Sequence, residues 1–417
     1  MKTTNRRNLF ILSFTLLVVM LGYSLAMPLL PFYIELFGVG GRELGWLVST
    51  YSLMQLICAP IWGVLSDRYG RKPILAIGVL GYTITLFLFG LAQSFLMLFL
   101  ARSLSGILSS ATMPTAMAYI SENSPQEEKS KGMGQLGAMV GVGVIIGPLL
   151  GGLLSTDSLS LPFFVGSGLA CLALLLVIFL LPESKLASSS TDELNLSNQE
   201  NPIVEADPLR PNATHSMRIR DIYLRVIFSP VGILLLLIFI MSFGLTNFQN
   251  MIGLYVVDKF AFGTKQVGVI WMVMGGVLIL VQGVLTGPLS KKLGELPLIR
   301  IGLFGGAIGF VLVALAINYI TALLAIGFFI CMLALIGPSL NAYISGFAGE
   351  HQGAVMGLNS MMTSLGRVIG PLWGGYIYDI NIEYPFFSGA ATLLLGVLVS
   401  FIGFLKHVSV HPKSVEV

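Results

Sequence analysis

Residues 134–152 read GQLGAMVGVGVIIGPLLGG, and residues 357–375 read GLNSMMTSLGRVIGPLWGG. Five glycines and one proline recur in the two stretches with identical spacing, which is very unusual for unrelated segments. The same relationship links residues 63–73 (GVLSDRYGRKP) to residues 287–297 (GPLSKKLGELP), which match at two glycines, a serine and a proline. These internal repeats indicate that the chain consists of two related halves.

The composition places both halves in a lipid bilayer. Of the 417 residues, 55% are hydrophobic and only 10% are charged, and the mean hydropathy is +0.88, whereas soluble domains carry about 25% charged residues. These values exclude a soluble enzyme, a secreted disulfide scaffold and a disordered chain. The net charge of +3 gives no basis for nucleic-acid binding. The three cysteines lie far apart in apolar stretches, so we expect neither a disulfide framework nor a metal site.

Continuous apolar stretches long enough to cross a bilayer as α-helices recur along the chain. We expect an all-α membrane protein with twelve transmembrane helices, arranged as two six-helix repeats around a central cavity. Because six is an even number, both repeats have the same orientation, as in the parallel repeats of transporters. The predicted spans are 9–36, 44–64, 73–92, 96–119, 132–154, 161–181, 229–257, 266–288, 297–317, 321–344, 353–378 and 384–405.

Lysine and arginine predict the orientation of these helices, because basic residues are enriched on the cytoplasmic side. With the N-terminus inside, eighteen of the 23 basic residues fall on the inner side, and the outer loops hold only Arg42, Lys259 and Lys265. Both termini are then cytoplasmic. The expected organisation is an N-terminal six-helix bundle (1–181), a polar cytoplasmic linker (182–224) and a C-terminal six-helix bundle with a short cytoplasmic tail (225–417).

Three of these motifs resemble the signatures of a known family. Residues 63–73, Arg102 with Gly106 in LARSLSG, and the glycine-proline pattern of 134–152 are similar to motifs of the major facilitator superfamily. The last resembles the antiporter motif of its 12-span drug:proton antiporter branch. The likeness covers the chain apart from the linker and the tails.

The resemblance implies proton-coupled efflux of small amphipathic drugs, of multidrug or tetracycline type, by alternating access in a bacterial inner membrane. The implied partners are a small-molecule drug or metabolite, protons and the lipid bilayer, and we expect a monomer without a cofactor. The alternative is an exporter of an endogenous metabolite such as a siderophore, a peptide or a sugar. An enzyme or an ATP-driven pump is disfavoured, because the chain has neither a GxxxxGK[ST] loop nor an HExxH motif.

Gating is the role that the resemblance implies for the repeated motifs. Glycines four residues apart let helices approach closely, and a proline permits a kink. The loop at 63–73 adds charged residues that would latch the two halves together. Tight helix packing and the positive-inside bias are the simpler alternatives. The predicted gating residues are Gly63, Asp67, Arg68, Gly70, Arg71, Gly143, Gly147, Pro148, Gly151, Gly152, Gly370 and Pro371.

Arg102 is the most informative single residue for proton coupling. It lies about 9 Å below the outer end of the fourth span, where an arginine costs at least about 2.5–3.5 kcal/mol. It must therefore snorkel to the interface or have a partner, and the family motif implies a titratable acid. No carboxylate lies at mid-span. Of the acids at the outer ends of the spans we favour Glu35 on the first span, because the resemblance implies that the first and fourth spans both line the cavity. Asp258 and Asp379 are the other candidates, and each of the three acids is otherwise a solvated interfacial residue.

For the substrate, the resemblance implies a cavity lined by the first, fourth, seventh and tenth spans. Methionine and aromatic side chains adapt to varied apolar ligands, although any one of them could equally face lipid or the helix core. Arg367, on the eleventh span, would bind a substrate carboxylate or backbone carbonyl groups. The lack of a deep carboxylate leaves neutral, zwitterionic and anionic substrates open. The predicted substrate-binding residues are Tyr23, Met27, Met113, Met117, Asn247, Phe248, Asn250, Phe329 and Arg367.

Overall fold

The computed structural model describes residues 6–156, 158–184, 230–347 and 352–408. Within these ranges the chain is almost wholly helical and contains no β-strand, which confirms the all-α prediction. The predicted linker, apart from its first three residues, and most of the predicted tail lie outside the described residues.

The helices follow the predicted spans closely. Those of the first half are α1 (Arg6–Ala26), α2 (Leu30–Leu36), α3 (Gly41–Tyr69), α4 (Arg71–Gly90), α5 (Phe95–Ser109), α6 (Thr112–Asn123), α7 (Gln126–Leu154) and α8 (Leu161–Leu180). Those of the second half are α11 (Pro230–Phe260), α12 (Thr264–Leu280), the π-helical turn η1 (Val281–Leu285), α13 (Thr286–Leu293), α14 (Glu295–Ala314), α15 (Tyr319–Phe347), α16 (Gln352–Tyr378) and α17 (Tyr384–Val408).

Three predicted spans are not single helices, because the regular backbone hydrogen bonding is interrupted within them. The first divides into α1 and α2 around Pro28 and Pro31, which lack the N–H that a continuous helix would use. The fourth divides into α5 and α6, and Pro114 lies in the first turn of α6. The eighth runs from α12 through the π-helical turn η1 into α13. These breaks change the course of a span without changing the number of crossings.

Eleven helical stretches of the described residues are long and apolar enough to cross a membrane. The twelfth expected span, α16, has 27 residues but is not among them. Its sequence includes Asn359, Ser360, Thr363 and Arg367. These side chains line a pocket between helices rather than facing lipid, so α16 does not need a lipid-like composition.

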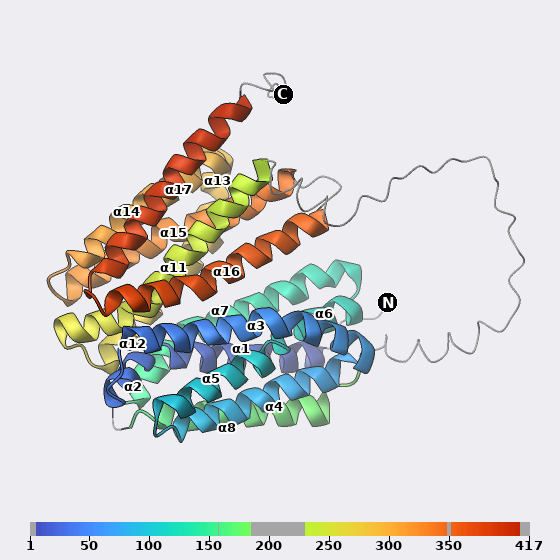
Figure 1. Cartoon of the computed structure of the whole chain (residues 1–417). Helices are drawn as coiled ribbons and strands as arrows, with labels where there is room; N and C mark the ends of the chain where they lie inside the picture. The colour runs from blue at the N-terminus through green and yellow to red at the C-terminus, as the bar shows by residue number, and fades with distance from the viewer. Residues whose placement is uncertain (1–5, 157, 185–229, 348–351, 409–417) are drawn as a thin grey trace, which may run out of the picture.

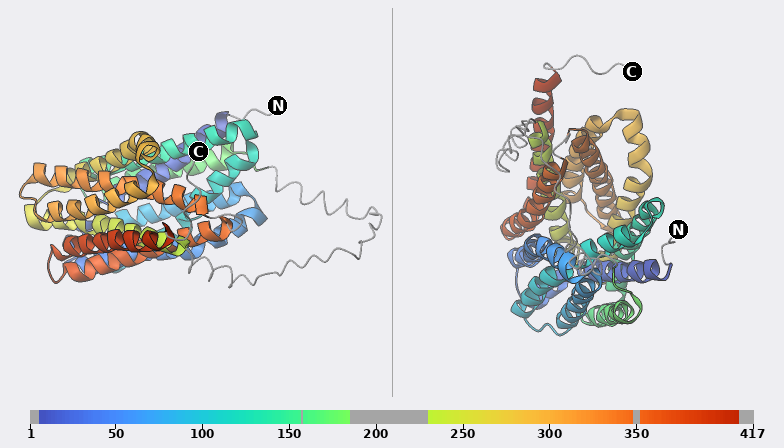
Figure 2. Two further views of the ribbon diagram at one scale, coloured as in Figure 1. Left: turned by 90° about the horizontal axis from the view of Figure 1, so that it is seen from above. Right: turned by 90° about the vertical axis from the view of Figure 1, so that its right-hand side faces the viewer.

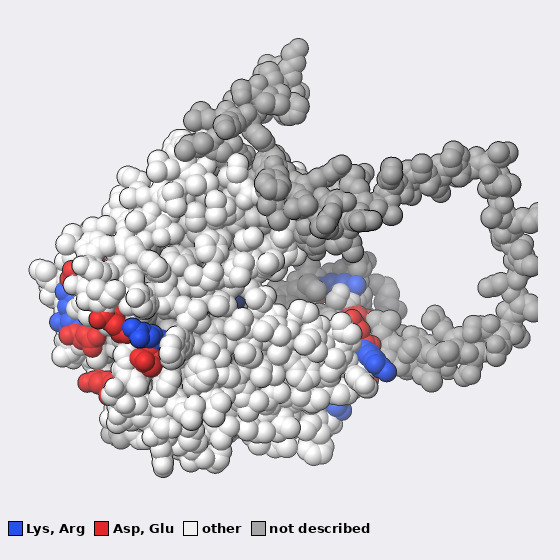
Figure 3. Space-filling model, in the orientation of Figure 1, with Lys and Arg blue, Asp and Glu red and all other residues white. Residues whose placement is uncertain are grey.

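The two halves lie side by side, meet at one end and spread apart toward the other (Figures 1 and 2). We call the end that holds α2 and the start of α12 the closed end, and the opposite end the open end. Across the halves, α3 packs on α16 and α7 packs on α12. Charged side chains gather at the two ends, with a broad uncharged band between them (Figure 3), as expected of a bilayer-spanning bundle.

Candidate functional site

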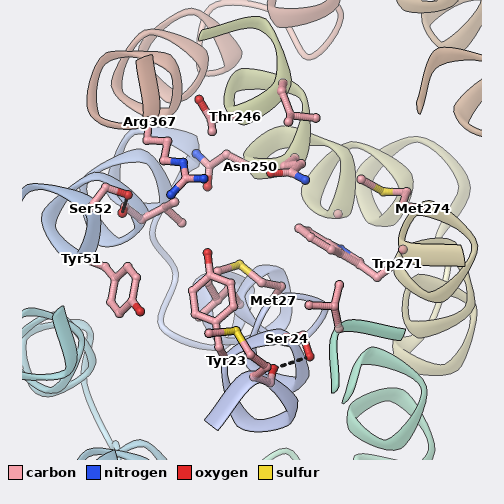
Figure 4. Close-up of a pocket in the computed structure, with 18 of the residues that line it drawn as sticks. Tyr23, Ser24, Met27, Tyr51, Ser52, Thr246, Asn250, Trp271, Met274 and Arg367 are labelled. Carbon is pink, nitrogen blue, oxygen red and sulfur yellow. Dashed lines mark hydrogen bonds between the residues drawn. The ribbon is translucent and has the colours of Figure 1, made fainter. Parts of the chain in front are cut away.

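A cavity of about 520 Å³ lies between the two halves. Its walls come mainly from α1, α3, α11 and α12, with single residues or pairs from α2, α6, α7, α15 and α16, so both halves contribute to it (Figure 4). A volume of this size suits a drug-sized ligand. Toward the closed end it is bounded by Leu30, Pro31, Leu44 and Gly253.

A second cavity, also of about 520 Å³, continues toward the open end. It reaches Ala59 and Pro60 of α3 and Gly357 and Met361 of α16. The residues common to both cavities are Met20, Tyr23, Tyr51, Ser52, Gln55, Met113 and Arg367. We call this continuous space the central cavity; it is sealed toward the closed end and extends toward the open end.

The lining of the central cavity is mainly apolar, with a few polar groups. Its large apolar side chains include Met20, Met27, Met113, Trp271 and Met274. Its polar side chains include Ser52, Gln55, Thr246, Gln249 and Asn250. Among the described residues that line it, Arg367 is the single charged one, and no aspartate or glutamate contributes to the wall.

Five of the predicted substrate-binding residues lie in this wall: Tyr23, Met27, Met113, Asn250 and Arg367. Tyr23 comes from the last turn of α1, Met27 directly follows this helix, and Asn250 comes from α11 (Figure 4). Arg367 reaches in from α16, on the side opposite Trp271. The described geometry is compatible with a binding role for all five.

Four other predicted substrate-binding residues are placed elsewhere. The amide of Asn247 is buried and donates to the carbonyl oxygen of Pro385 at 2.8 Å. Phe248 and Phe329 are buried with ring centres 4.2 Å apart, inside a cluster of aromatic rings of the second half. Met117 packs against the hydrophobic core from α6. None of the four is among the residues that line the described cavities, and their role in substrate binding stays a prediction.

Helical periodicity explains this outcome on α11. A helix turns by about 100° per residue, so Thr246, Gln249, Asn250 and Gly253 share one face, which lines the cavity. Asn247 and Phe248 point to other faces. The contributions of Trp271, Met274 and Gln55 were missed because α12 and α3 were not expected to line the cavity. The single tryptophan among the aliphatic residues of α12 was the available signal.

Arg102 lies beside the central cavity, behind two tyrosines. Its side chain is buried, with an exposed fraction of 3%. Its guanidinium carbon is 4.3 Å from the ring centre of Tyr51 and 5.4 Å from that of Tyr23. Its Nε and Nη2 atoms have no hydrogen-bond partner among the residues that the structure describes. The expected approach of Glu35 does not occur, because Glu35 is exposed on α2 at the closed end.

The other two candidate acids lie at the closed end, where both accept hydrogen bonds. Asp379, which follows α16, accepts hydrogen bonds from the backbone N–H groups of Gly41 at 2.8 Å and Arg42 at 3.3 Å. This carboxylate therefore caps the N-terminus of α3 in the other half, where a negative charge is favourable. Asp258 accepts a hydrogen bond of 2.6 Å from the hydroxyl of Tyr378, which joins α11 to α16.

The glycine stripe of α7 lets this helix contact two others. A Cβ atom on Gly151 would lie 2.7 Å from a backbone oxygen of α1, and Gly143 and Gly147 face the same helix. A Cβ atom on Gly152 would instead lie 2.6 Å from a backbone oxygen of α12, in the other half. Any side chain at these positions would force the helices apart.

The second half repeats this arrangement. Gly366, Gly370 and Gly374 face α11 within the second half, whereas Gly375 contacts α3 of the first half. A hydroxyl holds each pair of helices: Ser24 donates to the carbonyl oxygen of Gly143 at 2.8 Å, and Thr246 donates to that of Gly366 at 2.9 Å. The glycine motifs thus allow close helix–helix contacts both within each half and between the two halves.

Both motif prolines lie at the interface of the halves. The carbonyl oxygen of Pro148 would be 2.7 Å from a Cβ atom added on Gly268 of α12. The carbonyl oxygen of Pro371 would be even closer to a Cβ atom added on Gly45 of α3. Each proline remains inside a continuous helix. Ser49 adds a hydrogen bond of 2.7 Å to the carbonyl oxygen of Val368.

The charged segment 63–73, which comprises the end of α3, Gly70 and the start of α4, lies at the open end, and the hydrogen bonds and ion pairs that it makes with described residues stay within the first half. Arg71 pairs with Asp67 at 2.6 Å and, through Nε, donates to Glu122 at 2.9 Å. Gly70 has a φ of +98°, a conformation that favours glycine. Gly294, the equivalent residue of the second half, has a φ of +80°. Among the described residues this loop makes no ion pair with the second half, so its predicted latch between the halves stays a prediction.

Two six-span halves around a central cavity define a membrane transporter. The sequence profile of the Major Facilitator Superfamily matches residues 12–371, with a second match over 283–416. The chain belongs to this superfamily.

Curated relatives and solved structures agree with this assignment. The chain is 33% identical to "Multidrug resistance protein 1" of Bacillus subtilis (strain 168), over 94% of this chain and 95% of the relative. It is 30% identical to the "Quinolone resistance protein NorA" of Staphylococcus aureus (strain COL), over 95% and 96%. Among solved structures, a mutant of the nucleoside transporter NupG shares 14% identity over 95% of this chain and 99% of its own, with a TM-score of 0.76. A bacterial homologue of the human lysosomal transporter Spinster, in an inward-facing and occupied conformation, shares 15% identity over 97% and 98%, also with a TM-score of 0.76. These structural likenesses concern the fold alone.

Proposed function

We propose that this chain exports small amphipathic molecules, of the multidrug type, in exchange for protons by alternating access. The observation that carries the proposal is the central cavity, which extends toward the open end and is sealed at the closed end by contacts between the halves. Methionine, tyrosine and tryptophan side chains in its wall adapt to ligands of different shape. The names of the relatives, which refer to multidrug and quinolone resistance, support this substrate range.

For the orientation, we propose that the open end faces the cytoplasm of a bacterial cell. The described basic residues of the open end include Arg68, Arg71 and Lys72, whereas the closed end holds Arg42, Lys259 and Lys265. Over the described residues the excess of basic side chains lies on the side of the open end. In this orientation both termini are cytoplasmic. We further propose that the two bundles comprise residues 1–181 and 225–417 and that the protein functions as a monomer. The structure thus corresponds to a state loaded from the inside.

For proton coupling, we propose Asp379 and Asp258 as the acids at the closed end, with Arg102 as the cation beside the cavity. Neutralising Asp379 removes the cap that this residue provides for α3 and thereby weakens the contact between the halves. A proton that enters from the outside would thus favour opening of the closed end and release of substrate outward. Glu35, the acid favoured from the sequence, makes no side-chain contact with another described residue that would link its charge to the gate.

The test is efflux from de-energised bacteria that express the full chain and are preloaded with norfloxacin, ethidium or tetracycline. After re-energisation we expect export that a protonophore abolishes and that Arg102→Ala removes. Lys265→Gln is the matched control, because it removes a positive charge from an exposed side chain outside the cavity. It should export like the wild type.

Two results would contradict the proposal. Export that persists in the presence of the protonophore would overturn proton coupling. If the folded protein is present in the membrane and exports none of the three compounds, its substrate is an endogenous metabolite and not a drug.

A further inference from the structure

The charge distribution in the central cavity is one-sided. Arg367 lines this cavity and an adjoining pocket between α11, α15 and α16. Its side chain is exposed to the cavity, and it makes no ion pair or hydrogen bond with any described residue. Within the part of the chain that the structure describes, the cavity wall has no carboxylate to balance this arginine.

A second cation adds to the positive electrostatic potential of the cavity. Arg102 is buried behind Tyr23 and Tyr51, both of which line the cavity. Among the described residues its guanidinium contacts the faces of these two rings, and its Nε and Nη2 atoms have no hydrogen-bond partner. Since charges in a water-poor environment interact more strongly than in bulk water, both arginines make the cavity attractive to anions.

Unpartnered polar groups in the wall indicate where a ligand could bind. The indole Nε1 of Trp271 is buried and has no acceptor among the described residues. The side-chain oxygen of Asn250 likewise has no donor, whereas its amide nitrogen is 3.5 Å from the carbonyl oxygen of Pro371. Arg367 and Trp271 approach the cavity from opposite sides, and the side chain of Met27 lies below the space between them (Figure 4).

We propose that the central cavity selects amphipathic molecules that carry a carboxylate, which binds Arg367 while the aromatic body packs against Trp271 and Met27. The planar guanidinium matches a carboxylate with two parallel hydrogen bonds, which a lysine cannot reproduce. Trp271 offers one further N–H donor, and Asn250 accepts from a hydroxyl or amine of the ligand. Permanently cationic drugs find no counter-charge in the described wall. This inference rests on the proposed function, because it names the substrate class of the same cavity.

The test measures equilibrium binding to the purified full chain in lipid nanodiscs, so that it does not depend on transport. The probes are norfloxacin, its decarboxylated analogue and ethidium. We expect the wild type to bind norfloxacin at least about tenfold more tightly than the decarboxylated analogue, since hydrogen bonds to charged groups are strong. Ethidium should bind more weakly than norfloxacin.

Substitutions at Arg367 connect this preference to one side chain. Arg367→Gln should reduce the ratio of the two quinolone affinities to about one, and Arg367→Lys should retain only part of it. Lys265→Gln, which removes an exposed charge at the closed end, should leave the ratio unchanged. If Arg367 had a purely structural role, its substitution would weaken the binding of both quinolones alike and leave the ratio of their affinities unchanged. This result would overturn the proposal.

Equal affinities of the wild type for the two quinolones, or tighter binding of ethidium, would also overturn the anion preference. These outcomes are independent of the efflux test. If cells show no export but the purified protein prefers the carboxylate, the proposed export function fails and the anion site stands.

Discussion

The guanidinium carbon of Arg102 lies 4.3 Å from the centre of the Tyr51 ring. Contact with an aromatic face is worth about 2 kcal/mol for a desolvated cation, whereas removing that cation from water costs several kcal/mol. Because two of its nitrogen atoms have no partner among the described residues, Arg102 is incompletely compensated in this state. A conformation in which it gains an acceptor would repay this cost, so the residue can bias the transporter between states.

We therefore expect Arg102→Met to preserve or raise the thermal stability of the purified protein while it abolishes proton-dependent export. An apolar side chain of similar length removes a buried charge without leaving a cavity. Thermal unfolding in detergent and efflux from energised cells are the two measurements. Arg300→Met is the control, because Arg300 stacks on Phe401 at 4.0 Å and also donates to the carbonyl oxygen of Ser400. A marked fall in melting temperature for Arg102→Met alone would show that the arginine stabilises this state.

A second prediction concerns the cap that Asp379 provides for α3 across the halves. Asp379→Asn should weaken this cap by about 1 kcal/mol. The fraction of molecules in which this end of the transporter is open should therefore rise by about fivefold. The measurement is the labelling rate of Leu44→Cys by a membrane-impermeant maleimide from the outside, in a chain that lacks its native cysteines. Leu44 is buried near the closed end, so it reacts only when that end opens.

Glu43→Gln is the matched control for this experiment. The Glu43 carboxylate accepts a hydrogen bond from the backbone N–H of Gly40 at 2.9 Å and so caps the same helix from within its own half. Its neutralisation should leave the labelling rate of Leu44→Cys nearly unchanged. Equal rates in Asp379→Asn and in the parent chain would mean that the cap does not contribute to closure.

The large-scale organisation was predictable because it depends on patterns that many residues share. Apolar stretches predicted the helices of both halves, and the spacing of the glycines predicted a repeated close-packing motif. The cavity wall depends instead on the direction of individual side chains. On α11, Asn250 faces the cavity and Phe248, two residues away, faces an aromatic cluster, and both are compatible with the same composition. The position of Asp379 against α3 depends on how the halves close, which local sequence does not encode.

Substitutions at Gly152 and Gly151 distinguish the contact of α7 with the other half from its contact within the first half. Gly152→Ala would place a methyl group 2.6 Å from a backbone oxygen of α12, so α7 and α12 must move apart and the closed end is destabilised. We expect faster labelling of Leu44→Cys, by at least about fivefold, for an overpacking cost of about 1–3 kcal/mol. Gly151→Ala meets α1 within the first half and should lower the melting temperature without this increase. Gly137→Ala, with no atom within 4 Å of the added carbon, should alter neither quantity.

Phe248 and Trp271 distinguish residues that build the second half from residues that contact substrate. Phe248 is buried among Phe329, Phe310 and Phe386, with ring centres 4.2, 5.7 and 6.0 Å away. Phe248→Ala would leave a cavity in this cluster and should cost about 3–5 kcal/mol of stability. Its main effect is therefore a fall in melting temperature and in the amount of folded protein. The affinity of the fraction that remains folded for norfloxacin should change little.

Trp271→Ala should have the opposite effect, because this side chain borders the central cavity and leaves space rather than a sealed void when it is removed. We expect nearly unchanged thermal stability and norfloxacin binding that is weaker by about tenfold, since a large aromatic surface and one N–H donor are lost. Trp271→Phe retains the aromatic surface without the donor, so its affinity should lie between those of the wild type and Trp271→Ala. If Phe248→Ala weakened binding at full stability and Trp271→Ala did not, the aromatic cluster would belong to the substrate site after all.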